Sequence, residues 1–68
     1  MWVLTLRADY TVQAQGRFKT LAGAKRFAEP FILRRPAEHG ATIRPDNAVR
    51  PIWVGTAENG EVIWSEQS

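Results

Sequence analysis

The sequence predicts an α+β fold in which one helix packs on one face of an antiparallel sheet. Three observations favour this class: two alternating segments near the N-terminus, a capped apolar stripe at helical spacing, and a tryptophan-rich segment around an Asn-Gly turn. The expected order of elements is β-β-α-β-β. The chain has 68 residues, which is the size of one small domain spanning residues 1–68.

The first two strands are predicted from alternation between apolar and polar side chains. Residues 2–7 alternate, a short turn at Ala8-Asp9 follows, and residues 10–15 alternate again until Gly16 ends the segment. The two segments pair most simply as a hairpin with one wet face. The side chains that we expect to face inward are Trp2, Leu4, Leu6, Tyr10, Val12 and Ala14.

The helix is predicted to begin after Thr20, whose hydroxyl can accept a hydrogen bond from a first-turn N–H. Lys25 and Arg26 fall outside the apolar stripe, and we expect both to face water. We expect the helix over residues 20–29 at least, because Pro30 restricts the residue before it; a further turn through residue 33 is the alternative. Pro36 ends this region. The stripe consists of Leu21, Ala24, Phe27, Ala28 and Phe31.

The last two strands are predicted over residues 52–57 and 61–65. They are joined through Glu58-Asn59-Gly60, and Asn-Gly is a strong hairpin signal because both residues tolerate positive φ. Residues 37–51 are the least regular part of the chain. Within them, residues 42–44 could form a short strand and Asp46-Asn47 a turn.

The charge of the chain is divided between its two halves. Residues 1–35 carry seven basic and two acidic side chains, whereas residues 36–68 carry two basic and five acidic ones. A cationic half can contact phosphate or an acidic surface, although such residues also solvate the outer face of many small domains. The candidate binding residues around the helix, which could form one continuous patch, are Arg17, Lys19, Lys25, Arg26, Arg34 and Arg35.

Aromatic side chains offer a second source of binding. Seven are present, and some could form a platform on which bases stack, although a protein of this size needs most of them in its core. Trp53 and Trp64 are expected to lie next to each other on the C-terminal hairpin. One of them could be exposed as an interface anchor.

Catalysis and metal binding are not expected. The chain has no cysteine, and His39, its one histidine, has no partners at metal-ligand spacing, so we interpret it as a loop residue without a chemical role. Glu58 and Glu61 are expected to be a solvated hairpin tip. No hydroxyl has a base at a suitable spacing, and we predict neither enzyme activity nor a cofactor. Arg7 and Asp9 interrupt the apolar start, so we expect no secretory signal. No apolar run approaches the roughly 20 residues needed to span a membrane, so we expect a cytoplasmic protein without a membrane partner.

The chain contains seven segments of interest, which are Thr20-Leu21, residues 24–28, His39-Gly40, Ile43-Arg44, residues 52–55, residues 58–60 and Trp64. Together these segments resemble a small phage-encoded anti-CRISPR family of type I-F systems, which has the same length. The likeness covers roughly residues 18–68, and the longer spacing before His39 and the doublet Arg34-Arg35 depart from it. The resemblance implies a protein that docks on the Cas backbone subunits of a surveillance complex and covers the path of target DNA. Only Lys25 and Arg26 match its basic motif.

Three hypotheses for function follow. The first is a non-enzymatic, anti-CRISPR-like inhibitor that acts in the cytoplasm of a bacterial host cell, binds a Cas complex and uses the basic patch to block target DNA. The second is a small nucleic-acid-binding accessory or regulatory protein of phage or prophage origin. The third is an interaction domain with no nucleic-acid role. The sequence leaves the oligomeric state open.

Overall fold

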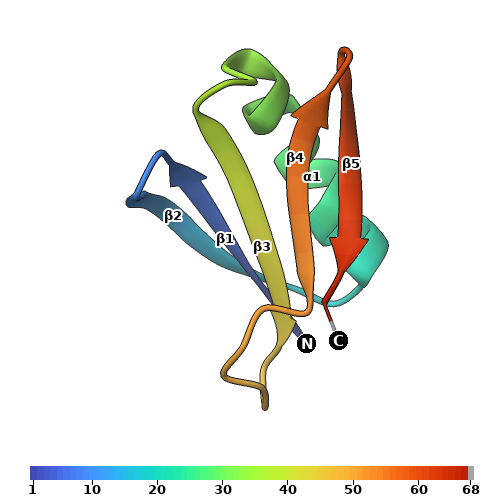
Figure 1. Ribbon diagram of the computed structural model, residues 1–68. Helices are drawn as coiled ribbons and strands as arrows, with labels where there is room; N and C mark the ends of the chain where they lie inside the picture. Colours follow the sequence, from blue (N-terminus) through green and yellow to red (C-terminus); the bar gives the residue numbers. More distant parts are fainter. Residues whose placement is uncertain (68) are drawn as a thin grey trace.

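A single helix lies against one face of a five-stranded antiparallel sheet (Figure 1). This computed structural model describes residues 1–67. Strand exceeds helix, at 51% against 21%, and the predicted α+β class is confirmed. Across the sheet the strands lie in the order β2-β1-β3-β4-β5. The elements are β1 (Trp2–Ala8), β2 (Thr11–Phe18), α1 (Leu21–Arg34), β3 (His39–Pro45), β4 (Trp53–Glu58) and β5 (Glu61–Glu66).

The order of elements is β-β-α-β-β-β, so the expected order lacks one strand. The added strand is β3, which contains the segment 42–44 for which the sequence indicates a short strand. It pairs along its whole length with β1, from Trp2 opposite Pro45 to Ala8 opposite His39. Such pairing is set by contacts across more than thirty residues of chain, for which the local sequence gives only a weak signal.

Strand β1, which lies between β2 and β3, is buried on both faces. Leu4 and Leu6 point toward α1, while Val3 and Thr5 point to the opposite side and are only 8% and 7% exposed. On that opposite side Val3 lies between Arg17 of β2 and Arg44 of β3 in the strand register. Long side chains from the neighbouring strands therefore cover the middle of a face that no helix in residues 1–67 covers.

The β1–β2 hairpin contains a bulge, which changes the residues of the second strand that face the helix from those predicted. Leu6 pairs with Ala14, but the next residue, Arg7, pairs with Val12, so Gln13 is the extra residue. The bulge moves Val12 to the face away from the helix, where it is 48% exposed. Tyr10 lies in the two-residue turn after Asp9, whose φ is 55°, and is 99% exposed. The predictions that these two side chains face the core were wrong.

Ala14, the third predicted inward residue of this segment, lies on the helix side of the sheet but is exposed. Its strand, β2, is at the sheet edge, and the helix leaves part of it uncovered.

The helix begins as predicted, with Thr20 Oγ1 accepting a hydrogen bond from the Gly23 N–H at 3.0 Å. It continues through Pro30 to Arg34, as in the longer of the two alternatives. Its buried residues, Ala24, Ala28 and Ile32, are four apart, so the buried stripe follows this row. Phe27 falls at the margin of that row and is 60% exposed, which corrects its assignment to the core.

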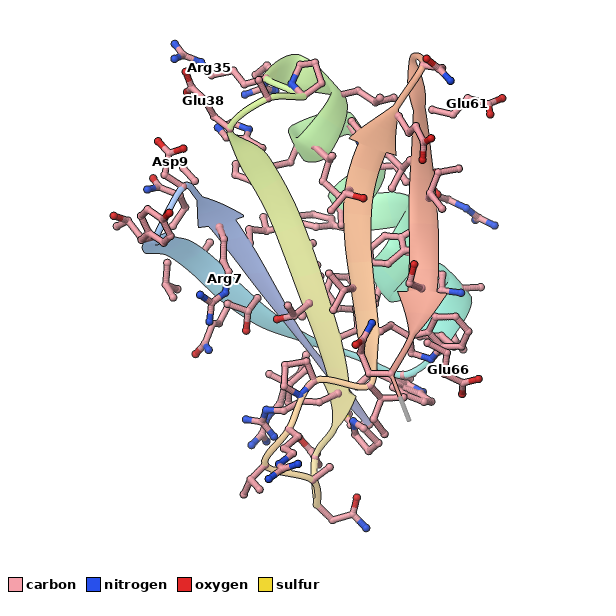
Figure 2. The ribbon with its side chains drawn as sticks, in the orientation of Figure 1. Arg7, Asp9, Arg35, Glu38, Glu61 and Glu66 are labelled. Carbon is pink, nitrogen blue, oxygen red and sulfur yellow. The ribbon has the colours of Figure 1, made fainter. Side chains whose placement is uncertain are left out.

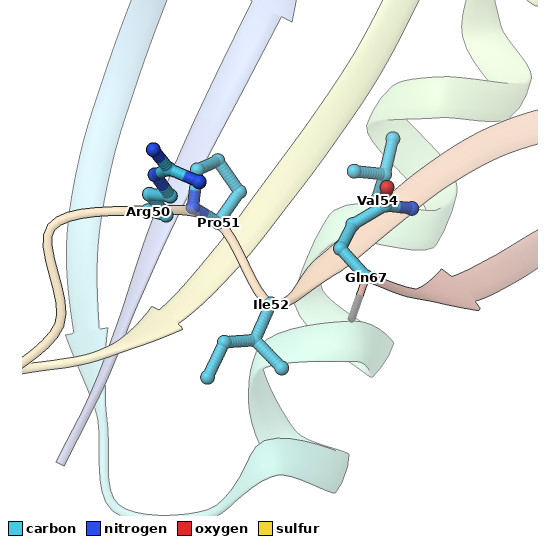
Figure 3. A pocket seen from close by; sticks show the side chains of 5 residues that line it. All are labelled: Arg50, Pro51, Ile52, Val54 and Gln67. Atoms are coloured by element: carbon cyan, nitrogen blue, oxygen red, sulfur yellow. The ribbon is translucent and has the colours of Figure 1, made fainter.

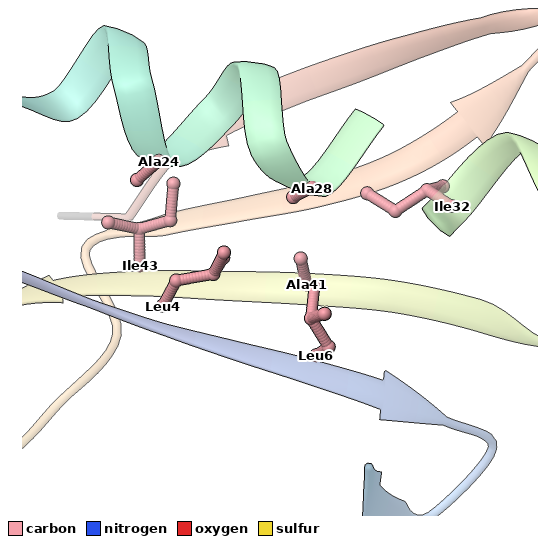
Figure 4. Close-up of a cluster of buried hydrophobic side chains, with 7 residues drawn as sticks. All are labelled: Leu4, Leu6, Ala24, Ala28, Ile32, Ala41 and Ile43. Atoms are coloured by element: carbon pink, nitrogen blue, oxygen red, sulfur yellow. The ribbon is translucent and has the colours of Figure 1, made fainter. Parts of the chain in front are cut away.

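The hydrophobic core lies between α1 and the two strands β1 and β3 (Figure 4). Alanines on the helix and on β3 keep the two layers close, and Ile32 and Ile43 fill the remaining space with no exposed surface. The buried side chains of the cluster are Leu4, Leu6, Ala24, Ala28, Ile32, Ala41 and Ile43.

The C-terminal hairpin agrees with the prediction to within a residue at each end. Asn59 and Gly60 both have positive φ, 55° and 81°, as a two-residue hairpin turn requires. Glu58 and Glu61 face each other across it and are exposed, as expected for a solvated tip.

The face of the sheet away from α1 is called the open face below. By the strand register it is formed by Val3, Thr5, Arg7, Val12, Gln15, Arg17, Thr42, Arg44, Val54, Thr56, Glu58, Glu61, Ile63 and Ser65. No helix among the described residues is long and apolar enough to span a membrane.

Candidate functional site

Four of the six candidate basic residues lie along the helix and at its ends. Arg26 and Arg34 are exposed and eight residues apart on α1, Lys19 lies in the turn before the helix, and Arg35 is its C-cap. The first three make no ion pair among the described residues. Arg35 pairs with Glu38 at 3.4 Å, but both side chains are about half exposed or more, so water screens this pair. These four residues are called the basic helix surface.

Arg17 does not belong to this surface. Its side chain is on the open face, on the other side of the sheet from α1, and its Nε lies 3.5 Å from Asp46 Oδ1. The prediction of one continuous patch of six residues was therefore wrong. The reason is the strand alternation, which directs Phe18 toward the helix and its neighbour Arg17 away from it.

Lys25 is also separated from the basic helix surface, and it does not face water as predicted. Its ammonium group lies 3.7 Å from the centroid of the Trp53 ring and 5.9 Å from that of Trp64, and the residue is half-buried. Attraction between the ammonium group and the indole faces holds it there. On the same side of the helix, Glu29 Oε2 accepts a hydrogen bond from Trp64 Nε1 at 3.1 Å. This cluster joins the helix to the C-terminal hairpin.

A second basic group lies on the open face and was not among the predicted site residues. It consists of Arg7, Arg17 and Arg44, from three neighbouring strands; Figure 2 labels Arg7 on its strand. Arg44 Nη1 donates to the Ala48 carbonyl at 2.8 Å and so also supports the β3–β4 loop. The alternation of residues 2–7 indicated that Arg7 points away from the core, but its neighbours became apparent only with β3 in the sheet.

The aromatic side chains do not form a stacking platform on the open face. The strand register puts Trp2, Phe18, Trp53 and Trp64 on the helix side, where they pack at the margin of the core. Both tryptophans of the C-terminal hairpin are half-buried, so neither stands free as an interface anchor. Any nucleic acid on the open face would thus be contacted by arginines through its phosphates rather than through its bases.

His39 is the first residue of β3 and not a loop residue as predicted. Its ring stacks on Phe31 with a centroid distance of 4.0 Å, and its Nδ1 lies 2.8 Å from the Phe31 carbonyl oxygen. Because a carbonyl only accepts, Nδ1 carries the proton that it donates to this helix-end carbonyl. Among residues 1–67 there is no group of three or more potential metal-ligating side chains.

An open depression lies near the β3–β4 loop and the end of β5 (Figure 3). Its volume is about 570 Å³, and Arg50 is the one charged residue among Arg50, Pro51, Ile52, Val54 and Gln67, which line it. A single exposed cation in a shallow, open depression does not define a ligand class.

Comparison of the chain with protein-family models, with curated proteins and with solved structures finds no match. Hypotheses about function therefore depend on the chain's own residues and their arrangement.

Proposed function

We propose that this chain is a non-enzymatic, anti-CRISPR-like inhibitor that binds the backbone subunits of a Cas surveillance complex and blocks its target DNA. The observation that carries the proposal is the basic helix surface, which has four cations along α1 and at its ends and only one, screened, acidic partner among residues 1–67. A guanidinium group can bind a phosphate or a carboxylate through two hydrogen bonds. Such a surface suits a complex whose groove holds nucleic acid.

The two residues of the basic motif that the resemblance includes, Lys25 and Arg26, have different roles in this proposal. Lys25 is held against Trp53 and contributes to the packing of the hairpin on the helix. Arg26, the next residue, is exposed and available to a partner. Arg26 and Arg34 are therefore the residues to test, since their replacement leaves the core and the tryptophan cluster intact.

The experiment measures binding of labelled target DNA to a purified type I-F surveillance complex loaded with its guide RNA. We expect the wild-type protein to reduce DNA binding in a saturable way. The double variant Arg26→Glu/Arg34→Glu should need about tenfold or more protein for the same inhibition, because two attractions become repulsions. Glu58→Lys/Glu61→Lys, on the acidic hairpin, is the matched control and should inhibit like wild type.

Absence of inhibition by the wild-type protein, in a complex that binds its DNA normally, would contradict the proposed target. Equal inhibition by the folded Arg26/Arg34 variant would instead remove the basic helix surface from the interface.

A second function, a small nucleic-acid-binding accessory or regulatory protein, is favoured by the three arginines of the open face. They lie on neighbouring strands, and no aromatic side chain lies among the residues that form this face, so binding to the phosphate backbone without sequence preference is expected. The test is binding to duplex DNA alone across a series of salt concentrations. Arg7→Glu/Arg17→Glu should weaken binding and lower the salt slope by about 1 for each phosphate that an arginine no longer binds.

A further inference from the structure

The strand β2 is an exposed sheet edge whose protection is limited to a bulge near the turn and one charged residue, Arg17. It pairs only with β1, so one side of its backbone has no strand beside it in residues 1–67. Edge strands commonly carry charges or prolines that prevent pairing with another chain. The other edge, β5, begins and ends with glutamate, whereas residues 11–16 of β2 carry neither a charge nor a proline. The bulge lies near the turn, and the register from Ala14 to Phe18 is regular.

An apolar crevice runs beside this edge, between β2 and α1. Its volume is about 140 Å³, similar to the cavity of about 150 Å³ lined by apolar side chains that is known to bind benzene. Small residues on the helix side of β2, Ala14 and Gly16, leave the space, and Phe27 forms its outer wall while remaining 60% exposed. The residues that line it are Leu4, Leu6, Ala14, Gln15, Gly16, Phe18 and Phe27.

The surroundings of the crevice are cationic. Residues 11–28, which form β2, the following turn and the first half of α1, contain four basic side chains and no acidic one. Of these, Lys19 and Arg26 are exposed and make no ion pair among residues 1–67, whereas Arg17 lies on the open face beside Asp46 and Lys25 is held against Trp53. Binding of a segment in the crevice is therefore favoured when acidic residues flank the apolar side chain that enters it. A second copy bound through the same edge would bring like charges together.

We propose that the β2 edge and the crevice beside it bind an extended segment of a partner protein. The segment adds as a sixth strand next to β2 and inserts one leucine or phenylalanine side chain between β2 and α1, with acidic residues flanking this side chain. Main-chain hydrogen bonds supply affinity in this mode, and the pocket supplies selectivity. The site is separate from the open face and does not require the function proposed above.

The probe is a short, fluorescently labelled peptide of strand-forming residues with a central leucine and glutamates at both ends. We expect saturable binding by fluorescence anisotropy, with amide shifts in nuclear magnetic resonance spectra concentrated on β2. Replacing the leucine by asparagine, or the glutamates by lysines, should weaken binding about tenfold or more. The backbone N–H groups of a strand point alternately to its two sides. Methylation of the alternate nitrogens that face β2 should therefore abolish binding, whereas methylation of the other set should not.

Variants of the protein test the same site. Gly16→Val fills the crevice, and Phe27→Ala removes its outer wall, so each should weaken peptide binding about tenfold or more. A Cβ at Gly16 meets only Phe18 Cε1, at 3.5 Å, so this variant is expected to fold; Ala14→Val is the substitute if it does not. Thr56→Val, on the open face, is the control and should bind the peptide normally.

Three results would overturn the proposal. The first is no saturable binding of the leucine peptide, and the second is equal binding of the leucine and asparagine peptides. The third is a dimer of the wild-type protein in sedimentation experiments that is lost in the folded Gly16→Val variant. The occupant of the site would then be a second copy and not a partner protein.

Discussion

The indole ring of Trp64 on β5 lies directly over Gly55, the residue opposite it on β4. A Cβ placed on this glycine would be 2.5 Å from Cζ3 of the ring, closer than real side chains approach each other. The same indole donates its Nε1–H to Glu29 on the helix. The absence of a side chain at position 55 therefore determines how the C-terminal hairpin meets α1.

Gly55→Ala is expected to destabilise the protein by about 1–3 kcal/mol, because the added methyl group must displace the large Trp64 ring. Urea unfolding followed by tryptophan fluorescence measures the change in the free energy of unfolding. Gly16→Ala is the control, since its Cβ would be at an ordinary distance from Phe18. Equal losses in the two variants would show that Trp64 can move without cost.

The helix phase is tested by two substitutions that remove large side chains. Ile32 has no exposed surface, and Ile32→Ala should cost about 2–5 kcal/mol of stability. Phe27 is 60% exposed and pairs with Phe18 at a ring-centroid distance of 5.3 Å, so Phe27→Ala should cost only about 0.5–1.5 kcal/mol. Thermal or urea unfolding checks both values. A larger loss at Phe27 than at Ile32 would reverse this assignment.

Lys25→Glu should lower stability by about 0.5–2 kcal/mol, because the attraction between the ammonium group and the Trp53 ring disappears. It also puts a second carboxylate one helical turn from Glu29, which adds repulsion. Arg26→Glu changes the charge by the same amount at an exposed position, and should change stability by less than about 0.5 kcal/mol. Thermal unfolding of the two variants compares them, and equal midpoints would contradict a structural role for Lys25.

Glu58 and Glu61 face each other directly across the C-terminal turn. Like charges at this position oppose pairing, so Glu61→Lys is expected to raise stability by about 0.2–1 kcal/mol at low salt. Glu61→Gln removes the repulsion without adding attraction and should gain less. Urea unfolding at low and high salt measures both variants, and the gain from lysine should diminish at high salt because the charges are exposed. A gain that salt leaves unchanged would contradict this electrostatic origin.

The elements with strong local signals were the ones that the sequence predicted well. Thr20 caps the helix through a hydrogen bond to a residue three positions away, and Asn59-Gly60 needs only its own backbone freedom. The bulge at Gln13 had no such signal, because alternation continues unbroken from the turn into the strand. Phe27 was assigned to the core because it satisfies helical spacing, as do the buried residues Ala24 and Ala28. Only packing against the sheet decides which of these side chains are buried.

The candidate site was predicted less completely, since it depends on which side of each element a charge occupies. Lys25 is held by Trp53, twenty-eight positions along the chain, and this interaction cannot be inferred from helical spacing alone. Arg44 joins Arg7 and Arg17 only because β3 pairs with β1. Residue types and net charge indicated a cationic protein. The division of its cations between two faces can be recognised only when the pairing of all five strands is known.

The position of β1 affects how the chain folds. Strand β1 lies inside the sheet with a neighbour on each side, and its second neighbour, β3, follows the helix in the chain. Closing this long-range pairing is slow compared with forming a local hairpin. A nascent chain ending at Arg35 has no β3 to cover the second side of β1 and should give a disordered circular dichroism spectrum. Cooperative folding is thus expected only once residues 39–45 have left the ribosome.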